Sequence, residues 1–247
     1  MNWLSQVHID EESAIGLIPA RGGSKSIPMK NIALVAGRPL ISYVISAGQK
    51  ASTLDRVYCS TDHQIIADVC TAEGIVVLDR PANLGEDDTP VADVVVNVLE
   101  TLARRFGTIP GMVALLQPTS PFLLGEHVDA CVRLLRSKPS ADSVQTICPV
   151  LHNNHAFNQR VVDDAGVRFR FLEERRNAYN KQRKPKHYIF GNLVVTRSRS
   201  LIAGSDCFGD NSFPVEIPRI YALDVDTADD LDYADYLVKR GALALNN

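Results

Sequence analysis

Residues 14–32 of the chain read Ala14-Ile-Gly-Leu-Ile-Pro-Ala-Arg-Gly-Gly-Ser-Lys-Ser-Ile-Pro-Met-Lys-Asn-Ile32. The apolar run at 15–18 predicts a buried β-strand, which Pro19 ends. The loop that follows carries glycine, hydroxyl and basic side chains: Arg21, Gly22, Gly23, Ser24, Lys25 and Lys30. Glycines let backbone N–H groups approach an anion closely, and the cations compensate its charge. Because α/β folds bind ligands at the carboxyl ends of strands, the segment predicts a phosphate site in such a fold.

This loop differs from the two common phosphate-binding motifs. It contains neither G-x-x-x-x-G-K-[ST] nor G-x-G-x-x-G, which disfavours a P-loop and a dinucleotide site. A surface loop with solvated charges is the alternative interpretation. The position directly after a buried strand favours a ligand site over that alternative.

Strand and helix patterns alternate along the chain. We expect strands at 15–19, 56–61, 75–78, 112–116, 143–149 and 188–196. We expect helices from about residue 39, at 62–73 with Asp62 as the N-cap, at 91–105, at 126–137 and at 227–241. This alternation predicts a three-layer αβα fold with a mostly parallel, doubly wound (Rossmann-like) sheet.

The composition limits the classes of protein to which the chain can belong. At 247 residues it is long enough for one large domain, 1–247, with a small insertion. A net charge of −3 does not favour a nucleic-acid partner, and no apolar run is long enough to cross a membrane. The five cysteines are odd in number and widely spaced, which favours reduced thiols and a cytoplasmic protein.

Residues 150–187 interrupt the alternating pattern. They are polar and basic, and Asp163-Asp-Ala-Gly166 is a hairpin signal. We interpret the segment as an arm inserted into the domain. A disordered basic loop is the alternative.

Two carboxylates stand close together near the end of the sequence, in Ala222-Leu-Asp-Val-Asp-Thr227. In an extended segment Asp224 and Asp226 project to the same side, where a cation would relieve their repulsion. Hard oxygen ligands suit Mg²⁺, which takes substrate phosphate and water as its other ligands. The pair therefore predicts a magnesium site with a catalytic role. Helix capping by Asp226 is an alternative that is compatible with metal binding.

The segment Ala20-Arg-Gly-Gly-Ser-Lys-x-Ile-Pro-x-Lys-Asn31 resembles the signature loop of the acylneuraminate cytidylyltransferases, which make CMP-sialic acid from CTP. Further pieces of this resemblance recur in order along most of the chain. It implies that the loop binds the nucleotide through Arg21, Gly22, Gly23, Ser24, Lys25, Lys30 and Asn31. It also implies that Arg21 and Lys30 act in catalysis with the two aspartates. The arm at 150–187 would mediate dimerisation and reach the neighbouring subunit's site.

Two more segments carry the resemblance. Arg80-Pro-Ala-Asn-Leu-Gly-x-Asp-Asp-Thr89 resembles the family's base-and-ribose segment, which implies that Arg80 contacts cytidine and that the backbone from Asp87 to Thr89, with Asp88 at its centre, recognises the base. An ion-paired surface arginine is the alternative for Arg80. Leu115-Leu-Gln-Pro-Thr-Ser-Pro121 resembles the segment in which a glutamine, here Gln117, lies between nucleotide and sugar acid.

The acceptor-binding half departs from the family pattern P-x-x-[FY]-x-x-N-G-x-x-Y. Here the segment reads Pro185-Lys-His-Tyr188-Ile-Phe-Gly191-Asn192-Leu-Val-Val195, so Asn-Gly is inverted, the tyrosine is Val195 and a basic position is Ile189. The preceding Arg-Gln reads Lys181-Gln182, with Arg183 one step on. The resemblance implies that the acceptor contacts Gln117, Lys181, Arg183, Tyr188 and Asn192.

These observations predict a CTP-dependent cytidylyltransferase that acts as a homodimer on a small acidic acceptor, most simply a nonulosonic acid, with Mg²⁺ as cofactor. The altered acceptor segment leaves a phosphonate or another small acid open. Two other functions also remain open: a nucleotide-binding regulatory module without turnover, and a sugar-1-phosphate nucleotidylyltransferase that uses UTP or GTP.

Overall fold

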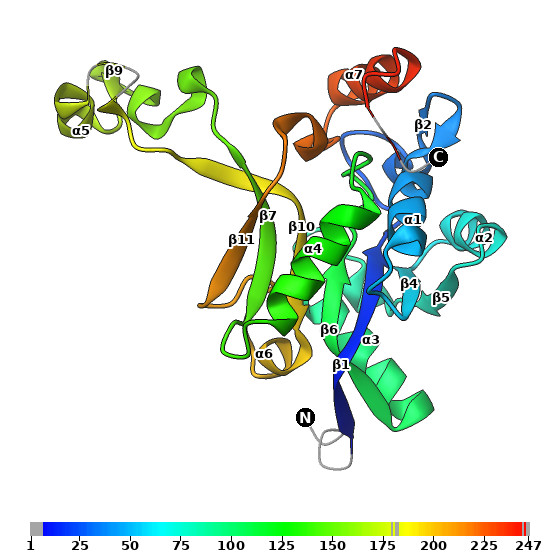
Figure 1. Cartoon of the computed structure of the whole chain (residues 1–247). Helices are drawn as coiled ribbons and strands as arrows, with labels where there is room; N and C mark the ends of the chain where they lie inside the picture. Colours follow the sequence, from blue (N-terminus) through cyan, green and yellow to red (C-terminus); the bar gives the residue numbers. More distant parts are fainter. Residues whose placement is uncertain (1–6, 179, 181–182, 244, 246–247) are drawn as a thin grey trace.

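The computed structural model describes residues 7–178, 180, 183–243 and 245. Within these residues the main sheet has seven strands in the order β11-β7-β10-β6-β1-β4-β5 (Figure 1). Their bounds are His8–Pro19 (β1), Arg56–Thr61 (β4), Val76–Asp79 (β5), Thr108–Leu115 (β6), Ser143–Pro149 (β7), Tyr188–Arg197 (β10) and Ser212–Glu216 (β11). Neighbouring strands run parallel except at β10, which is antiparallel to both β6 and β7.

Helices cover both faces of this sheet. They are Leu40–Lys50 (α1), Gln64–Ala72 (α2), Val91–Phe106 (α3), Gly125–Arg136 (α4) and Ser198–Ile202 (α6), while a further helix, Ala228–Lys239 (α7), packs beyond the sheet. In β1, Ile18 packs in the cluster formed with α1, α2 and α4, whereas Leu17 packs in the cluster formed with α3 and α6. Successive side chains of a strand point to opposite faces, so a strand covered on both faces is apolar at every position. The predicted αβα fold is confirmed.

The segment that follows the basic loop meets the carboxy-terminal helix through a third apolar cluster. Behind the basic loop lies a small hairpin, Leu34–Val35 (β2) and Arg38–Pro39 (β3), which contacts α7. Val35 is buried with Val225 and Leu237, and the Ala36 N–H donates to Asp235 Oδ1 over 2.8 Å. This packing brings the segment before α7 alongside the basic loop.

Three local features differ from the sequence expectations. β1 begins at His8, before the predicted strand at 15–19, because residues 8–10 add ladder pairs to β6. β11 at the sheet edge was not expected. The prediction that Asp62 caps α2 was wrong. His63 is the N-cap, and its Nδ1 accepts from the Ile65 N–H, while Asp62 Oδ1 accepts from the Gly22 N–H over 2.8 Å.

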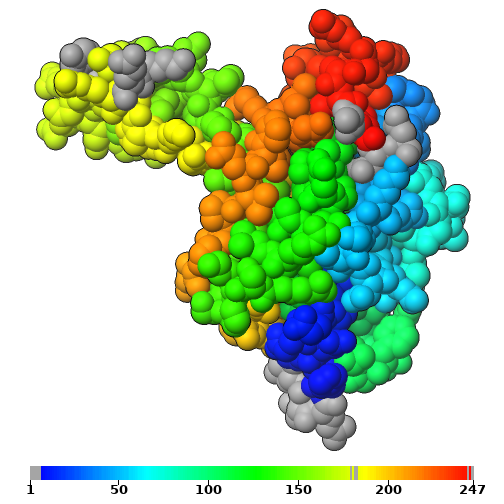
Figure 2. All heavy atoms as spheres, viewed as in Figure 1, coloured from blue at the N-terminus to red at the C-terminus, as the bar shows by residue number. Residues whose placement is uncertain are grey.

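Residues 150–187 form an arm that stands away from the body of the molecule (Figures 1 and 2). It contains the antiparallel hairpin Arg160–Asp163 (β8) and Gly166–Phe169 (β9), followed by Leu172–Asn177 (α5). The hairpin predicted at 163–166 is confirmed, with Gly166 at φ +110° in its turn. Among the described helices, none combines the length and apolar character needed to cross a membrane.

Candidate active site

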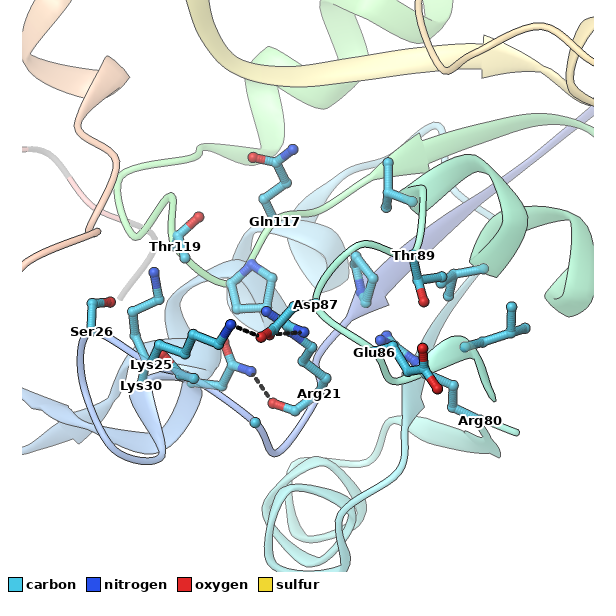
Figure 3. A pocket seen from close by; sticks show the side chains of 18 residues that line it. Arg21, Lys25, Ser26, Lys30, Arg80, Glu86, Asp87, Thr89, Gln117 and Thr119 are labelled. Carbon is cyan, nitrogen blue, oxygen red and sulfur yellow. Dashed lines mark hydrogen bonds and ion pairs between the residues drawn. The ribbon is translucent and has the colours of Figure 1, made fainter. Parts of the chain in front are cut away.

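A cavity of about 580 Å³ opens where strands of the parallel half of the sheet end. Its wall combines segments that follow β1, β5 and β6, since parallel strands present their carboxyl ends at one edge. Figure 3 shows its polar side chains, which include Arg21, Lys25, Lys30, Arg80, Asp87, Gln117 and Thr119. Cations from the first loop thus share a cavity with residues that lie at least fifty positions further along the chain.

The basic loop is fixed by contacts of its own backbone. Asn31 Nδ2 donates to the Arg21 carbonyl over 2.8 Å, and the Gly22 N–H donates to Asp62 over 2.8 Å. A Cβ at Gly22 would lie 2.5 Å from the His63 ring, so only glycine allows this close approach to the end of β4. Gly23, Ser24 and Lys25 line the cavity beyond this anchor.

Asp87 bridges two cations of the loop. Its carboxylate accepts from Arg21 Nη1 over 2.6 Å and also pairs with Lys25, as the dashed lines in Figure 3 show. The Lys25 and Arg21 cations hold the pKa of Asp87 below its usual range. The neighbouring Asp88, which was expected in the nucleotide site, does not line the cavity, whereas Asp87 and Thr89 do.

Arg80 forms a buried part of the cavity wall. Only 8% of the residue is exposed, and its guanidinium donates to the Ser60 carbonyl over 2.8 Å. Burial lowers the pKa of Arg80. The alternative of an ion-paired surface arginine is therefore wrong, and the cation is held where the cavity can use it.

The carboxylate pair lies at the edge of the same cavity. Lys30 Nζ donates to Asp226 Oδ1 over 3.0 Å. The Thr119 hydroxyl, which lines the cavity, bonds to Asp224, and the Thr119 carbonyl accepts from the Val225 N–H over 2.8 Å. The structure therefore brings the amino-terminal cations and the carboxy-terminal carboxylates to one place.

Asp226 does not cap α7. The cap is Thr227, whose hydroxyl accepts from the Asp230 N–H, while the Asp230 carboxylate accepts from the Thr227 N–H over 2.8 Å. The Asp226 carboxylate instead points to Lys30, with 70% of its side chain exposed. Capping by Asp226 is thus excluded, and its oxygen atoms remain accessible.

The donor set at the pair suits a small hard cation. Desolvation raises the pKa of Asp224, the negative charge of Asp226 raises it further, and Thr119 and Lys30 oppose the rise. A cation between the carboxylates would relieve this repulsion. No group of three or more His, Cys, Asp or Glu side chains suited to a metal occurs among the described residues. Two carboxylates, with the remaining ligands from phosphate and water, fit Mg²⁺ better than a metal caged by protein alone.

The residues expected to bind the acceptor are dispersed in one chain. Gln117 lines the cavity. Arg183 lies in the arm, and Tyr188 lines a different recess at the base of the arm. Lys181 lies outside the described residues. A single chain therefore brings only Gln117 of the described members of this set to the cavity.

Asn192 is placed differently from the expectation. It is fully buried, its Nδ2 donates to the Tyr221 carbonyl over 2.8 Å, and its Oδ1 accepts from the Thr146 hydroxyl over 3.0 Å. The inverted order has a steric reason, because a Cβ at Gly191 would lie 2.6 Å from the Thr146 hydroxyl oxygen. The prediction of direct acceptor contact by Asn192 is corrected: it tethers the turn Arg219–Ala222, which leads to Asp224.

Sequence reasoning missed two residues that support the site. Thr119 bonds to Asp224, and His127 packs edge-on against the Tyr221 ring at a centroid distance of 5.3 Å. The only available signal for Thr119 was its place two residues after Gln117 at a strand end. His127 lies within a helix, where nothing in the sequence separates it from a surface histidine.

The chain is similar to several known proteins. The family described as Cytidylyltransferase matches residues 15–237. The chain is 29% identical over 237 residues to the CMP-N,N'-diacetyllegionaminic acid synthase of Legionella pneumophila, covering 94% of this chain and 98% of that protein. It is 28% identical over 227 residues to the pseudaminic acid cytidylyltransferase of Campylobacter jejuni, covering 90% and 95%.

Other relatives are longer than this chain. It is 25% identical over 218 residues to the N-acylneuraminate cytidylyltransferase of Streptococcus agalactiae, covering 87% of this chain but only 51% of the relative, so it spans about half the length of that protein. Among solved structures, CMP:2-keto-3-deoxy-manno-octonic acid synthetase complexed with CTP superposes with a TM-score of 0.70 at 17% identity, over 93% of this chain and 99% of that one. That likeness shows a shared fold. With a match that spans most of its length, the chain belongs to the cytidylyltransferase family.

Proposed function

We propose that the protein is a CTP-dependent cytidylyltransferase that transfers CMP to a nonulosonic (sialic-type) acid and releases pyrophosphate. The contact between Lys30 and Asp226 carries the proposal, because it joins a cationic loop to a carboxylate pair at one cavity. The relatives from Legionella pneumophila and Campylobacter jejuni, which match over nearly their full length, are named for nonulosonic acids and support this acceptor class.

The reaction exchanges one bond at phosphorus for another. The acceptor hydroxyl oxygen forms a bond to the α-phosphorus of CTP, the bond from that phosphorus to the bridging oxygen breaks, and pyrophosphate leaves. The hydroxyl proton passes to solvent, and we assign no separate general base. Arg21, Lys25 and Lys30 surround the space for the triphosphate and stabilise the negative charge that builds up on it.

The Asp87 bridge occupies the cationic loop before the ligand binds. In the structure Asp87 occupies two of the cations that phosphate oxygens would use. When the triphosphate binds, its oxygen atoms replace those of Asp87 as partners of Arg21 and Lys25. The positive charges of these two neighbouring side chains are therefore compensated both before and after binding. Arg80 and the backbone near Thr89 remain available for the nucleoside.

We also propose Mg²⁺ as the cofactor, held by Asp224 and Asp226. When bound, Mg²⁺ neutralises phosphate charge and lowers the pKa of the acceptor hydroxyl. The chain's own part is to fix both carboxylates: Thr119 holds Asp224, and Lys30 holds Asp226. Calorimetric titration of the CTP complex with Mg²⁺ measures this site without relying on turnover.

A pyrophosphate-release assay tests the function. Purified protein with Mg²⁺ would receive CTP, UTP or GTP together with N-acetylneuraminic acid, N,N'-diacetyllegionaminic acid or a small phosphonate. We expect release with CTP and a nonulosonic acid. Release with phosphonates alone would assign another acceptor class. CTP binding without any release would indicate a regulatory module, and preference for UTP or GTP a sugar-1-phosphate enzyme.

We further propose that two copies associate through the arm. Val162, Val167 and Leu172 are 74%, 69% and 43% exposed on a segment that stands off the body, which is costly for a monomer in water. Sedimentation should give a dimer that Val162→Asp with Val167→Asp dissociates; a wild-type monomer would contradict this. The five cysteines are free and buried, which supports a cytoplasmic setting.

A further inference from the structure

A second cavity, of about 520 Å³, lies beside the carboxylate pair. Asp224 forms part of its wall, and the Thr119 hydroxyl that bonds to Asp224 lines the first cavity. The two cavities therefore meet at the Asp224–Thr119 contact. A group held in the second cavity can reach the same carboxylate that borders the nucleotide space.

The charged side chains of this second cavity are Asp224 and Arg219. Arg219 is exposed, and within the described part of the chain no carboxylate lies within ion-pair distance of it. Glu216 shares a neighbouring recess with Arg219 but forms no ion pair with it. The backbone at Arg219 is fixed, because Asn192 holds the Tyr221 carbonyl of the same turn. The cavity thus offers an anchored, uncompensated cation.

The rest of the wall is largely apolar. Leu151, Ile189 and Ile220 line it and are 51%, 45% and 38% exposed. Exposed apolar side chains gathered around one concave surface mark a place where an apolar group can leave water. Ile189 stands where the family pattern has a basic residue. The wall therefore suits a ligand that combines an anionic group with apolar substituents.

We propose that this second cavity binds the acceptor, with its carboxylate paired to Arg219 and its acyl or methyl groups against the apolar wall. This inference rests on the proposed function. In the ring form of a nonulosonic acid, the carboxylate and the reacting hydroxyl are attached to the same carbon atom. A cation that binds the carboxylate must therefore lie close to the groups that handle the hydroxyl. Arg219 and Asp224 meet this requirement by lining one cavity.

The proposal assigns the carboxylate to a cation of the same chain. The arm residue Arg183, which the family resemblance suggested, belongs to a segment that stands away from the body in this chain. Arg219 instead precedes Asp224 by five residues and shares a cavity with it. An arginine also matches a carboxylate through two parallel hydrogen bonds, which a lysine cannot reproduce.

The test combines a change in the protein with a change in the ligand. Arg219→Ala, Arg219→Lys and the control Arg105→Ala, an exposed arginine near the end of α3, would be assayed for pyrophosphate release. Acceptors are N-acetylneuraminic acid and its methyl ester, whose carboxylate is neutralised. We expect Arg219→Ala to raise the KM for the acid by about 10- to 100-fold. The KM of Arg219→Lys should lie between those of the wild type and Arg219→Ala, and the affinity for CTP should be unchanged in both variants. The wild type should use the methyl ester with a low kcat/KM, and Arg219→Ala should not lower this kcat/KM further.

The apolar wall is tested in the same assay. Ile189→Gln should lower the ratio of kcat/KM for N,N'-diacetyllegionaminic acid to that for N-acetylneuraminic acid, because the diacylated acid places more apolar surface in the cavity. An unchanged ratio would remove this part of the proposal.

The outcomes separate this inference from the proposed function. A wild-type enzyme that uses the acid while Arg219→Ala behaves like Arg105→Ala would overturn the inference alone. Equal losses for acid and ester would overturn it too, since the effect would not depend on the carboxylate. If Arg219→Ala changes the sedimenting mass but not the acceptor KM, the cavity is a contact between subunits and the inference fails. A wild type inactive with every sugar acid would overturn both.

Discussion

Lys30 Nζ and Asp226 Oδ1 lie 3.0 Å apart although 196 residues separate them in sequence. Lys30 has only 14% of its side chain exposed, whereas Asp226 is open to solvent. The packing of α7 on the small hairpin behind the basic loop creates this contact. Folding of the carboxy-terminal helix is thus a condition for completing the site.

Replacing Asp226 should impair chemistry more than folding. Asp226→Asn keeps the size of the side chain and its hydrogen bond from Lys30 but removes the charge that would hold Mg²⁺. We expect kcat to fall by about 10²- to 10³-fold with little change in the melting temperature. Steady-state pyrophosphate release and thermal unfolding provide the two measurements.

Asp232→Asn is the matched control for this prediction. Asp232 is another exposed carboxylate, and it lies on α7 away from the cavity lining. Its replacement should leave kcat unchanged. Similar losses in both variants would mean that the net charge of the helix, and not the position of Asp226, supports turnover.

The Asp87 bridge should compete with the nucleotide. Asp87→Asn removes the anion that occupies Arg21 and Lys25, so CTP should bind about two- to five-fold more tightly at low salt. The gain should shrink at high salt, where interactions between exposed charges are screened. Calorimetric titration with CTP at two ionic strengths measures this effect. Weaker CTP binding in the variant would show instead that Asp87 organises the loop for its ligand.

The sequence was sufficient for the fold and for the cationic half of the site. The run at 15–18 is apolar at every position because both faces of β1 are covered, and this pattern is readable without a structure. A phosphate site could be predicted in the loop after this strand because glycines and cations directly after a buried strand are typical of anion binding. The distance between Lys30 and Asp226, in contrast, depends on how α7 packs on the hairpin, which no local pattern reports.

The acceptor half could not be predicted because its residues act through long-range packing. The sequence suggests that Asn192 is a polar residue of a binding motif. In the structure the Thr146 hydroxyl, on the neighbouring strand, donates to Asn192 Oδ1 and accepts from its backbone N–H. Asp62 reads as a helix cap, yet the glycine loop takes its carboxylate. In each case a tertiary partner binds the side chain to which the sequence pattern assigns another role.

Removing the Asn192 amide should destabilise the protein. Asn192→Ala leaves the partly buried Tyr221 carbonyl without its side-chain donor, reduces the buried Thr146 hydroxyl to its backbone partners and opens a small cavity, at a cost of about 2–3 kcal/mol. For a chain of this length that corresponds to a fall in Tm of about 5–10 °C. Calorimetry measures the Tm, and steady-state kinetics measure kcat. We expect kcat to fall because the turn before Asp224 loosens. A large rise in acceptor KM at unchanged Tm would restore a direct role for Asn192 in binding.

His127 should make the stability of the fold depend on pH. Burial lowers the pKa of His127 to about 4, well below the value of about 6.5 in an unfolded chain. The folded protein therefore binds fewer protons than the unfolded one between these two values, so its free energy of unfolding decreases as the pH falls through this window. Between pH 7 and pH 5 the loss from this group is about 2 kcal/mol.

His127→Gln isolates this contribution. In the structure His127 Nδ1 accepts a hydrogen bond from the Leu124 N–H. A glutamine side-chain oxygen can still accept this bond, but glutamine does not titrate. Urea unfolding at pH 7 and pH 5 should show that the variant loses about 2 kcal/mol less than the wild type over this interval. Because carboxylates with depressed pKa values, such as Asp87 and Asp142, titrate at lower pH, they do not mask the difference. Equal losses in the two proteins would mean that the ring is protonated in the folded state, which its packing against Tyr221 opposes.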